Sequence, residues 1–149
     1  MEVRPWQQHY DGHVKLDQAY PEIGIPEFLR QSAARVPERT AVFFGDIASD
    51  GQLYSRQISY AELDELTDRF AGALQQEGFK KGDRVAFYMP NCPQYMIGYY
   101  GTLKAGGIVV PCNALMVARE VAAQVNNAGA EFLVVAGQMY AAIKAIRAN

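Results

Sequence analysis

The sequence predicts an α/β fold, a partial doubly wound parallel sheet with helices on both faces, preceded by an extended arm and an antiparallel strand pair. From Arg84 onward, short apolar runs alternate with helix-length segments, a pattern typical of right-handed crossovers that build a parallel sheet. The first run, residues 84–89, is apolar at both alternating sets of positions, which indicates a strand covered on both faces. A chain of 149 residues that is 50% hydrophobic is also long enough to bury a core.

The composition excludes several classes of function. With 14 basic and 16 acidic side chains the formal net charge is -2, so the chain has no electrostatic field to collect nucleic acid. Cys92 and Cys112 are the only cysteines, and the first residues lack the apolar segment of a secretory signal, so we expect buried thiols in a reducing cytoplasm. The longest apolar stretch, residues 92–111, is interrupted by glycines and Lys104 and is too broken to span a bilayer.

The first predicted elements are an arm, a helix and a strand pair. Residues 1–24 contain prolines and glycines without a sustained period, which indicates an extended arm. A short amphipathic helix begins at Ile25, with Pro26 in its first turn, and ends at Pro37. Residues 40–44 and 53–58 then predict two antiparallel strands joined by the turn-rich residues 45–51.

The clearest helix begins after Ser59. Ser59 and Glu62 have the spacing of a capping box, and Gly78 supplies a left-handed stop. One apolar stripe runs along this helix through Tyr60, Leu63, Leu66, Phe70 and Leu74.

A second helix follows the strand at residues 84–89. Asn91 is suited to cap it, Pro93 fits its first turn, and its side chains are apolar nearly all round, so we expect it to be buried. Gly98 and Gly101 lie one turn apart and are expected to bring this helix close to the sheet. The remaining segments predict a strand at 108–110, a helix at 119–127, a strand at 131–135 and a helix at 138–148.

Candidate binding residues follow the predicted parallel strands. Residues 89–91, 111–113 and 136–137 leave three strands at the same edge of the sheet, where open α/β folds place their ligands, so Asn91, Cys112 and Asn113 are the candidate substrate-binding residues. The alternative is that Asn91 and Asn113 cap helices or turns and that Cys112 fills space.

We assign no catalytic, cofactor-binding or metal-binding residue from the sequence. Neither a dinucleotide-binding glycine motif nor a P-loop occurs. His9 and His13 are separated by Gly12 and have no third ligand cluster nearby, so a role in arm packing or in solvent is expected for them.

The stretch ISYAELDELTDRFAGALQQEGFKKGDRVAFYMPNCPQYMIGYYGTLKAGGIVVPCN resembles the opening of the large domain of the adenylate-forming, AMP-binding acyl-CoA synthetases, ending in an LKAGG-x-VVP-type motif. The leader Arg4-Pro5-Trp6 with His9-Tyr10-Asp11 is similar to that of bacterial long-chain fatty acid to CoA ligases. Residues 119–131 are similar to the segment after the motif, so the likeness covers nearly the whole chain. The sequence departs from many relatives at Ala114 and Ala118, where they carry proline, so we expect either a less rigid loop after Asn113 or an earlier start of the next helix.

The resemblance implies a division of the chain and a reaction of its parent. Residues 1–24 are the arm, and residues 25–149 are the amino-terminal α/β subdomain of a truncated large domain. The full-length parent is implied to form an acyl-adenylate from a fatty acid and ATP with magnesium, and then to transfer the acyl group to coenzyme A. In that family the phosphate loop, the ribose-binding acid and the catalytic lysine lie downstream of this region. The 149-residue fragment alone is therefore expected to be inactive.

The same resemblance supplies the expected partners: the rest of the parent ligase, together with its fatty acid, ATP and coenzyme A. A fatty substrate makes peripheral contact of this cytoplasmic protein with the inner membrane a further expectation. An open sheet edge or the arm is expected to lead to self-association, for example as a homodimer. The alternative to the ligase fragment is a free-standing α/β binding or interaction module without catalysis.

Overall fold

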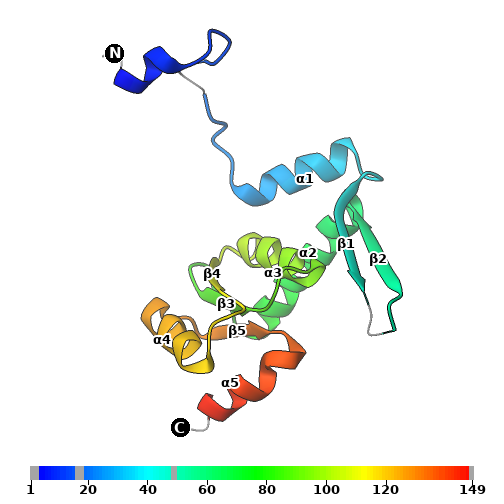
Figure 1. Cartoon of the computed structure of the whole chain (residues 1–149), viewed down its shortest axis with the longest axis vertical. Helices are drawn as coiled ribbons and strands as arrows, with labels where there is room; N and C mark the ends of the chain where they lie inside the picture. Colours follow the sequence, from blue (N-terminus) through cyan, green and yellow to red (C-terminus); the bar gives the residue numbers. More distant parts are fainter. Residues whose placement is uncertain (1–3, 16–18, 48–49, 148–149) are drawn as a thin grey trace.

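The computed structural model describes residues 4–15, 19–47 and 50–147. An arm leads into a body in which helices pack on both faces of a small sheet, with a strand pair to one side (Figure 1). The elements run in the order η1 (Pro5–His9), α1 (Ile25–Arg35), β1 (Thr40–Ile47), β2 (Leu53–Ser59), α2 (Tyr60–Gln76), β3 (Arg84–Tyr88), α3 (Pro93–Lys104), β4 (Ile108–Cys112), α4 (Ala118–Ala128), β5 (Phe132–Val135), η2 (Gly137–Met139) and α5 (Tyr140–Arg147).

The arm lies apart from the body of the chain (Figure 1). It is not extended throughout, because it contains a 3-10 helix. Residues Pro5–His9 form a 3-10 helix because the Arg4 backbone amide donates to Gln7 Oε1 at 2.6 Å, which closes the first turn locally. The Arg4 guanidinium also lies over the Trp6 ring, 5.4 Å from its centroid. The arm thus carries local structure that the scattered prolines and glycines did not predict.

The strand pair is longer than predicted. β1 and β2 are antiparallel, and Gly45, Asp46 and Ile47 continue the ladder opposite Ser55, Tyr54 and Leu53 instead of forming a loop. Ile58 at the end of β2 is buried against α1 and α2, with Leu29 and Leu63. This contact attaches the strand pair to the body.

The predicted cap of α2 is half formed. Ser59 Oγ accepts a hydrogen bond from the Glu62 amide at 3.2 Å, as expected for an N-cap serine. The Glu62 carboxylate does not complete the box, because Arg56 Nη2 on β2 donates to it at 3.1 Å. Glu62 therefore ties the helix to the strand pair.

The two glycines of α3 have different neighbours. Gly98 packs on the sheet as predicted: a Cβ there would lie 2.3 Å from Cε1 of Phe87 on β3. The prediction is wrong for Gly101, which packs against helix α2, where a Cβ would lie 2.9 Å from the Thr67 carbonyl oxygen. Three residues of an α-helix correspond to a rotation of about 300° about the helix axis, so the two glycines do not point in the same direction. Gly101 therefore faces α2, whereas Gly98 faces the sheet. Together they let α3 approach β3 and α2 closely.

The sheet is parallel, with strand order β4-β3-β5. Val85, Phe87 and Met89 pack on the side of α2 and α3, whereas Ala86 and Tyr88 pack on the side of α4 and α5, so β3 is covered on both faces as predicted (Figure 1).

Three details of the helices around the sheet differ from the predictions. The N-cap of α3 is Cys92, so Asn91 lies one position too early to cap it, and many of the large α3 side chains are half-buried. Helix α4 begins at Ala118, one residue earlier than predicted. The last predicted helix is divided into η2 and α5, and residue 148 lies outside the described residues. In the described part of the chain, every helix is too short or too polar to cross a membrane.

Candidate functional site

The three strand exits lie at one edge of the sheet, as predicted, because β4, β3 and β5 are parallel neighbours. Two cavities flank the segment that leaves β3. The β4-side cavity, of about 510 Å³, is lined by Met89, Pro90, Asn91, Tyr95, Pro111, Cys112, Asn113 and Ala114. The β5-side cavity, of about 630 Å³, is bounded by the β3 and β5 exits and by residues 44–46 of β1. The structure therefore brings Asn91, Cys112 and Asn113 together around the β4-side cavity.

Asn91 has the position most suited to contact a ligand. Its side chain is exposed, it borders both cavities, and it makes no side-chain hydrogen bond within the described residues. Because it does not cap α3, its amide group is available to donate and to accept.

The side-chain oxygen of Asn113 already accepts a hydrogen bond within the turn that follows β4. Asn113 Oδ1 accepts a hydrogen bond from the Leu115 amide at 2.9 Å, so Asn113 has the turn-capping role that the sequence offered as the alternative to ligand binding. The turn holds the start of the loop that bounds the cavity beyond β4.

Cys112 forms a buried, uncharged part of the cavity wall. The side chain is 4% exposed and packs with Ala86, Tyr88 and Val121. Burial raises the pKa of the Cys112 thiol above its ordinary value, so the thiol stays protonated at neutral pH. A protonated, buried thiol is a packing group rather than a nucleophile, which agrees with the space-filling alternative.

Tyr95 also lines the β4-side cavity, although its place in the sequence predicts only an apolar helix residue. Burial, and then its proximity to Tyr99 and Cys112, raises the pKa of the Tyr95 hydroxyl. The phenol is therefore a neutral donor at physiological pH. Its position in the first turn of the helix that follows the β3 exit was the available signal in the sequence.

The lining of the β4-side cavity contains no Lys, Arg, Asp or Glu. A triphosphate requires cations or several converging backbone amides, so these residues do not fit ATP or a magnesium–phosphate group. A neutral ligand with apolar segments and amide or carbonyl groups does fit them. In the described part of the chain no three His, Cys, Asp or Glu side chains gather as a potential metal site, and His9 and His13 are exposed.

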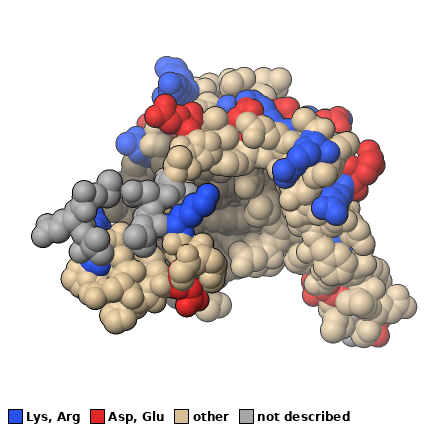
Figure 2. All heavy atoms as spheres, turned by 90° about the horizontal axis from the view of Figure 1, so that it is seen from above, with Lys and Arg blue, Asp and Glu red and all other residues tan. Residues whose placement is uncertain are grey.

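The surface charge is mixed. On the face shown in Figure 2, Lys and Arg side chains alternate with Asp and Glu around a hollow lined by other residues. No large patch of one sign covers that face, as the net charge of -2 suggests.

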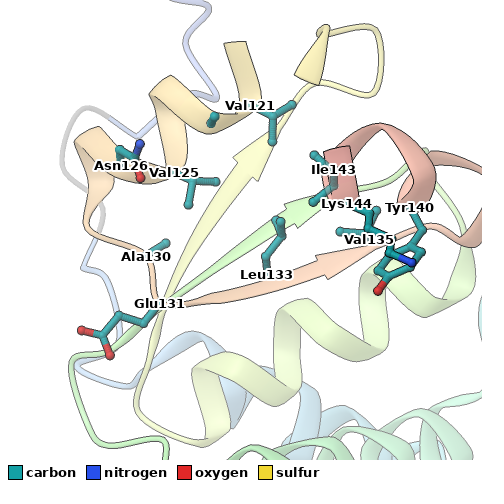
Figure 3. A pocket seen from close by; sticks show the side chains of 11 residues that line it. Val121, Val125, Asn126, Ala130, Glu131, Leu133, Val135, Tyr140, Ile143 and Lys144 are labelled. Carbon is teal, nitrogen blue, oxygen red and sulfur yellow. The ribbon is translucent and has the colours of Figure 1, made fainter. Parts of the chain in front are cut away.

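A third recess, the α4–α5 groove, lies on one face of β5 (Figure 3). Its volume is about 480 Å³, and its floor is formed by Leu133 and Val135 between Val121 and Ile143. Glu131 and Lys144 lie toward opposite ends of it (Figure 3).

Comparison with known proteins gives one consistent family. The family described as "AMP-binding enzyme" matches residues 29–149. The chain is 38% identical over 127 residues to a long-chain-fatty-acid--CoA ligase of Bacillus subtilis (strain 168), covering 84% of this chain and 21% of that protein. It is 39% identical over 92 residues to a crotonobetaine/carnitine--CoA ligase of Salmonella paratyphi A, covering 62% of this chain and 18% of that protein. The chain thus spans about a fifth of the length of these relatives.

Solved structures show the same likeness. A fatty acyl CoA synthetase of Mycobacterium tuberculosis is similar with a TM-score of 0.72 and 31% identity, covering 84% of this chain and 24% of that one. The inhibitor-bound N-terminal domain of FACL13 from the same organism is similar with a TM-score of 0.71 and 32% identity, covering 84% and 30% of the two chains.

Proposed function

This chain belongs to the AMP-binding enzyme family and corresponds to the amino-terminal portion of its acyl-CoA synthetases, and on that premise we propose that it is the structural part of a ligase joining a long-chain fatty acid to coenzyme A. The observation that carries the proposal is the 38% identity over 127 residues to a long-chain-fatty-acid--CoA ligase. The crotonobetaine/carnitine ligase matches only 92 residues, so a long-chain acyl substrate is the better supported of the two.

In this proposal the chain supplies a scaffold rather than the reacting groups. ATP, magnesium and the thiol of coenzyme A serve the reaction of the whole ligase, and the uncharged β4-side cavity of this chain does not fit the triphosphate. We assign no reaction step to the described residues. Their contribution is to hold the carboxyl ends of the parallel strands in a fixed position and to exclude water from the cavity there.

The β4-side cavity is proposed to form part of the path taken by the acyl chain or by the pantetheine arm of coenzyme A. The Asn91 amide and the Tyr95 hydroxyl would donate to a carbonyl of such a ligand. Cys112 would contribute neutral, polarisable wall surface, and Asn113 would hold the loop beside it. The tight packing of α3 on Phe87 keeps this wall rigid.

A chimera tests the proposal directly. The matching segment of the Bacillus subtilis ligase is replaced by this chain, and thioester formation is measured with palmitate and with crotonobetaine, each with ATP, magnesium and coenzyme A. We expect a folded chimera that uses palmitate. A folded chimera inactive with both acids, or one that prefers crotonobetaine, would contradict the proposed function.

The second candidate is a free-standing interaction module with the same fold, favoured by the apolar α4–α5 groove. The 149-residue chain is assayed alone for release of pyrophosphate with palmitate, ATP and magnesium. Both candidates predict no turnover here, so turnover by the chain alone would refute both. Activity of the chimera favours the ligase over the module.

A further inference from the structure

Tyr95, in the first turn of α3, lines two cavities at once. One is the β4-side cavity, and the other is a recess of about 290 Å³ between β1 and the start of α3. The recess is mainly apolar, with Val42 and Phe44 of β1 on one side and Met96 of α3 on the other. Asn91 and Tyr95 are the two residues common to both linings. The Tyr95 ring therefore belongs to the wall that the two spaces share.

Two other aromatic rings contact the ring of Tyr95. The Phe87 ring, on the central strand β3, meets it in an edge-type arrangement, with the centroids 5.6 Å apart and the planes at 60°. Tyr99, one turn further along α3, stacks on it with a centroid distance of 6.2 Å and an angle of 30°. Pairs with these geometries attract one another beyond the area that they bury. The orientation of the Tyr95 ring is thus fixed by its own helix and by the adjacent strand.

Phe87 is itself unable to move. Its side chain is 0% exposed, and its ring occupies the space that the missing side chain of Gly98 leaves on α3. Gly98 lies three residues after Tyr95, so the two are neighbours on one face of the helix and the same Phe87 ring contacts both. A close-packed interior leaves such a ring no free volume. Phe87 therefore gives Tyr95 a rigid support.

The hydroxyl end of Tyr95 lies near the exit of β4. Burial is the first cause of its raised pKa, and the proximity of Tyr99 and of Cys112 adds to it. Cys112 ends β4 and lines the β4-side cavity. The ring thus extends from α3 toward β4.

We propose that the Tyr95 ring is a fixed partition that limits the length of acyl chain accepted by the β4-side cavity, and that Phe87 and Tyr99 are its positioning residues. This role rests on the proposed function, because the occupant of the cavity is taken to be the acyl chain of the substrate. The recess behind the ring is apolar, so a hydrocarbon chain would extend into it if the ring were absent. The contacts that hold Tyr95 lie inside the chain, and further polypeptide could only bury them more deeply.

The selectivity of the palmitate-active chimera for chain length tests the partition. In Tyr95→Ala the ring is absent, and the ratio of kcat/KM for arachidate to that for palmitate is expected to rise roughly tenfold. Tyr95→Phe keeps the ring and removes only the hydroxyl, so its ratio is expected to stay unchanged. Tyr99→Ala removes the stacking partner and should raise the ratio by a smaller factor. Tyr95→Leu, a milder truncation, should raise it even if the alanine variant does not fold.

Tyr54→Ala is the matched control, because it removes a tyrosine ring from an exposed position on β2. An unchanged ratio in both truncations of Tyr95 overturns the partition and leaves the proposed function standing; this is also the result expected if the pantetheine arm occupies the cavity. A ratio that rises equally in Tyr95→Phe overturns it too, because the hydroxyl would then set the length. A chimera inactive with both acids refutes the proposed function, and the length limit fails with it.

Ring contacts in the 149-residue chain test the positioning residues without any activity. Nuclear Overhauser effects are expected from the Tyr95 ring to the rings of Phe87 and Tyr99. In Tyr99→Ala the effect between Tyr95 and Phe87 is expected to weaken, because the ring gains freedom. Absence of these contacts from the original chain overturns the partition, whatever the activity of the chimera. An undiminished contact with Phe87 in Tyr99→Ala removes Tyr99 from the positioning residues.

Discussion

Lys104 Nζ on α3 lies 2.7 Å from Asp64 Oδ1 on α2, and the lysine side chain is only 1% exposed. The same nitrogen donates to the Asp64 carbonyl oxygen at 2.9 Å and lies 2.7 Å from Asp68 Oδ1. One ammonium group thus has three partners on the neighbouring helix. A buried charge with several partners is costly to disrupt, because removing one member leaves the others without a partner.

Replacing Lys104 by methionine is expected to destabilise the chain by about 1–3 kcal/mol, since the carbonyl and the carboxylate of Asp64 lose a buried donor. The measurement is urea unfolding. Arg69→Met is the matched control, because its ion pair with Glu65 is exposed on both sides and contributes little. Equal losses for the two variants would show that the Lys104 contacts are unimportant.

Gly98→Ala is expected to cost about 1–3 kcal/mol, because the added methyl group overlaps the Phe87 ring. Gly72→Ala in α2 is the control: nothing lies within 4 Å of its Cβ position, and alanine there is expected to stabilise by about 0.5–1 kcal/mol. Thermal unfolding measures both. In a Phe87→Leu background the penalty at position 98 should shrink, and an unchanged penalty would refute the contact.

Tyr88→Phe is expected to weaken the loop that follows β4. The Tyr88 hydroxyl donates to the Met116 carbonyl at 2.6 Å, and its loss should cost about 1 kcal/mol. Faster proteolytic cleavage in this loop is the specific readout. Tyr54→Phe, at an exposed position on β2, serves as the control and should leave cleavage unchanged.

Cys112 is expected to react more slowly than Cys92 with a thiol reagent at pH 8. Burial raises the pKa of Cys112, which lowers its thiolate fraction and also restricts access. The raised pKa also means that its contribution to stability is complete below the thiol pKa of the unfolded chain and is lost as pH rises above it. Reaction rates of Cys92→Ser and Cys112→Ser variants separate the two thiols; equal rates would place Cys112 at the surface.

Asn91→Trp in the palmitate-active chimera is expected to reduce turnover of long acyl chains about tenfold, because an indole would fill the β4-side cavity. Asn91 is exposed, so folding should not change. Arg69→Trp, on the exposed face of α2, is the control. An unaltered dependence on chain length would remove Asn91 from the ligand path.

The sequence predicted the order of elements well because most of them depend on local signals. The Ser59 cap, the Gly78 stop and the two-sided apolar run at 84–89 each reflect a period or a terminus that neighbouring residues determine. The parallel direction of the strands was also predicted, since alternating strands and helices lead to a parallel sheet, whereas the order β4-β3-β5 was not.

What the sequence did not predict depends on contacts between distant segments. The direction of Gly101 depends on where α2 lies, and the choice of Glu62 between Ser59 and Arg56 depends on how β2 approaches the helix. The candidate site shows the same division. The edge carrying Asn91, Cys112 and Asn113 follows from topology, whereas the place of Tyr95 in the cavity required knowledge of how α3 is rotated.

The proline in β4 has a consequence for how this architecture can be enlarged. Pro111 has no amide hydrogen, and its carbonyl oxygen accepts a hydrogen bond from Gln124 Nε2, so neither of its backbone groups can pair with a strand added beside β4. A further strand would therefore extend this sheet more readily beside β5 than beside β4, and a single proline accounts for that difference.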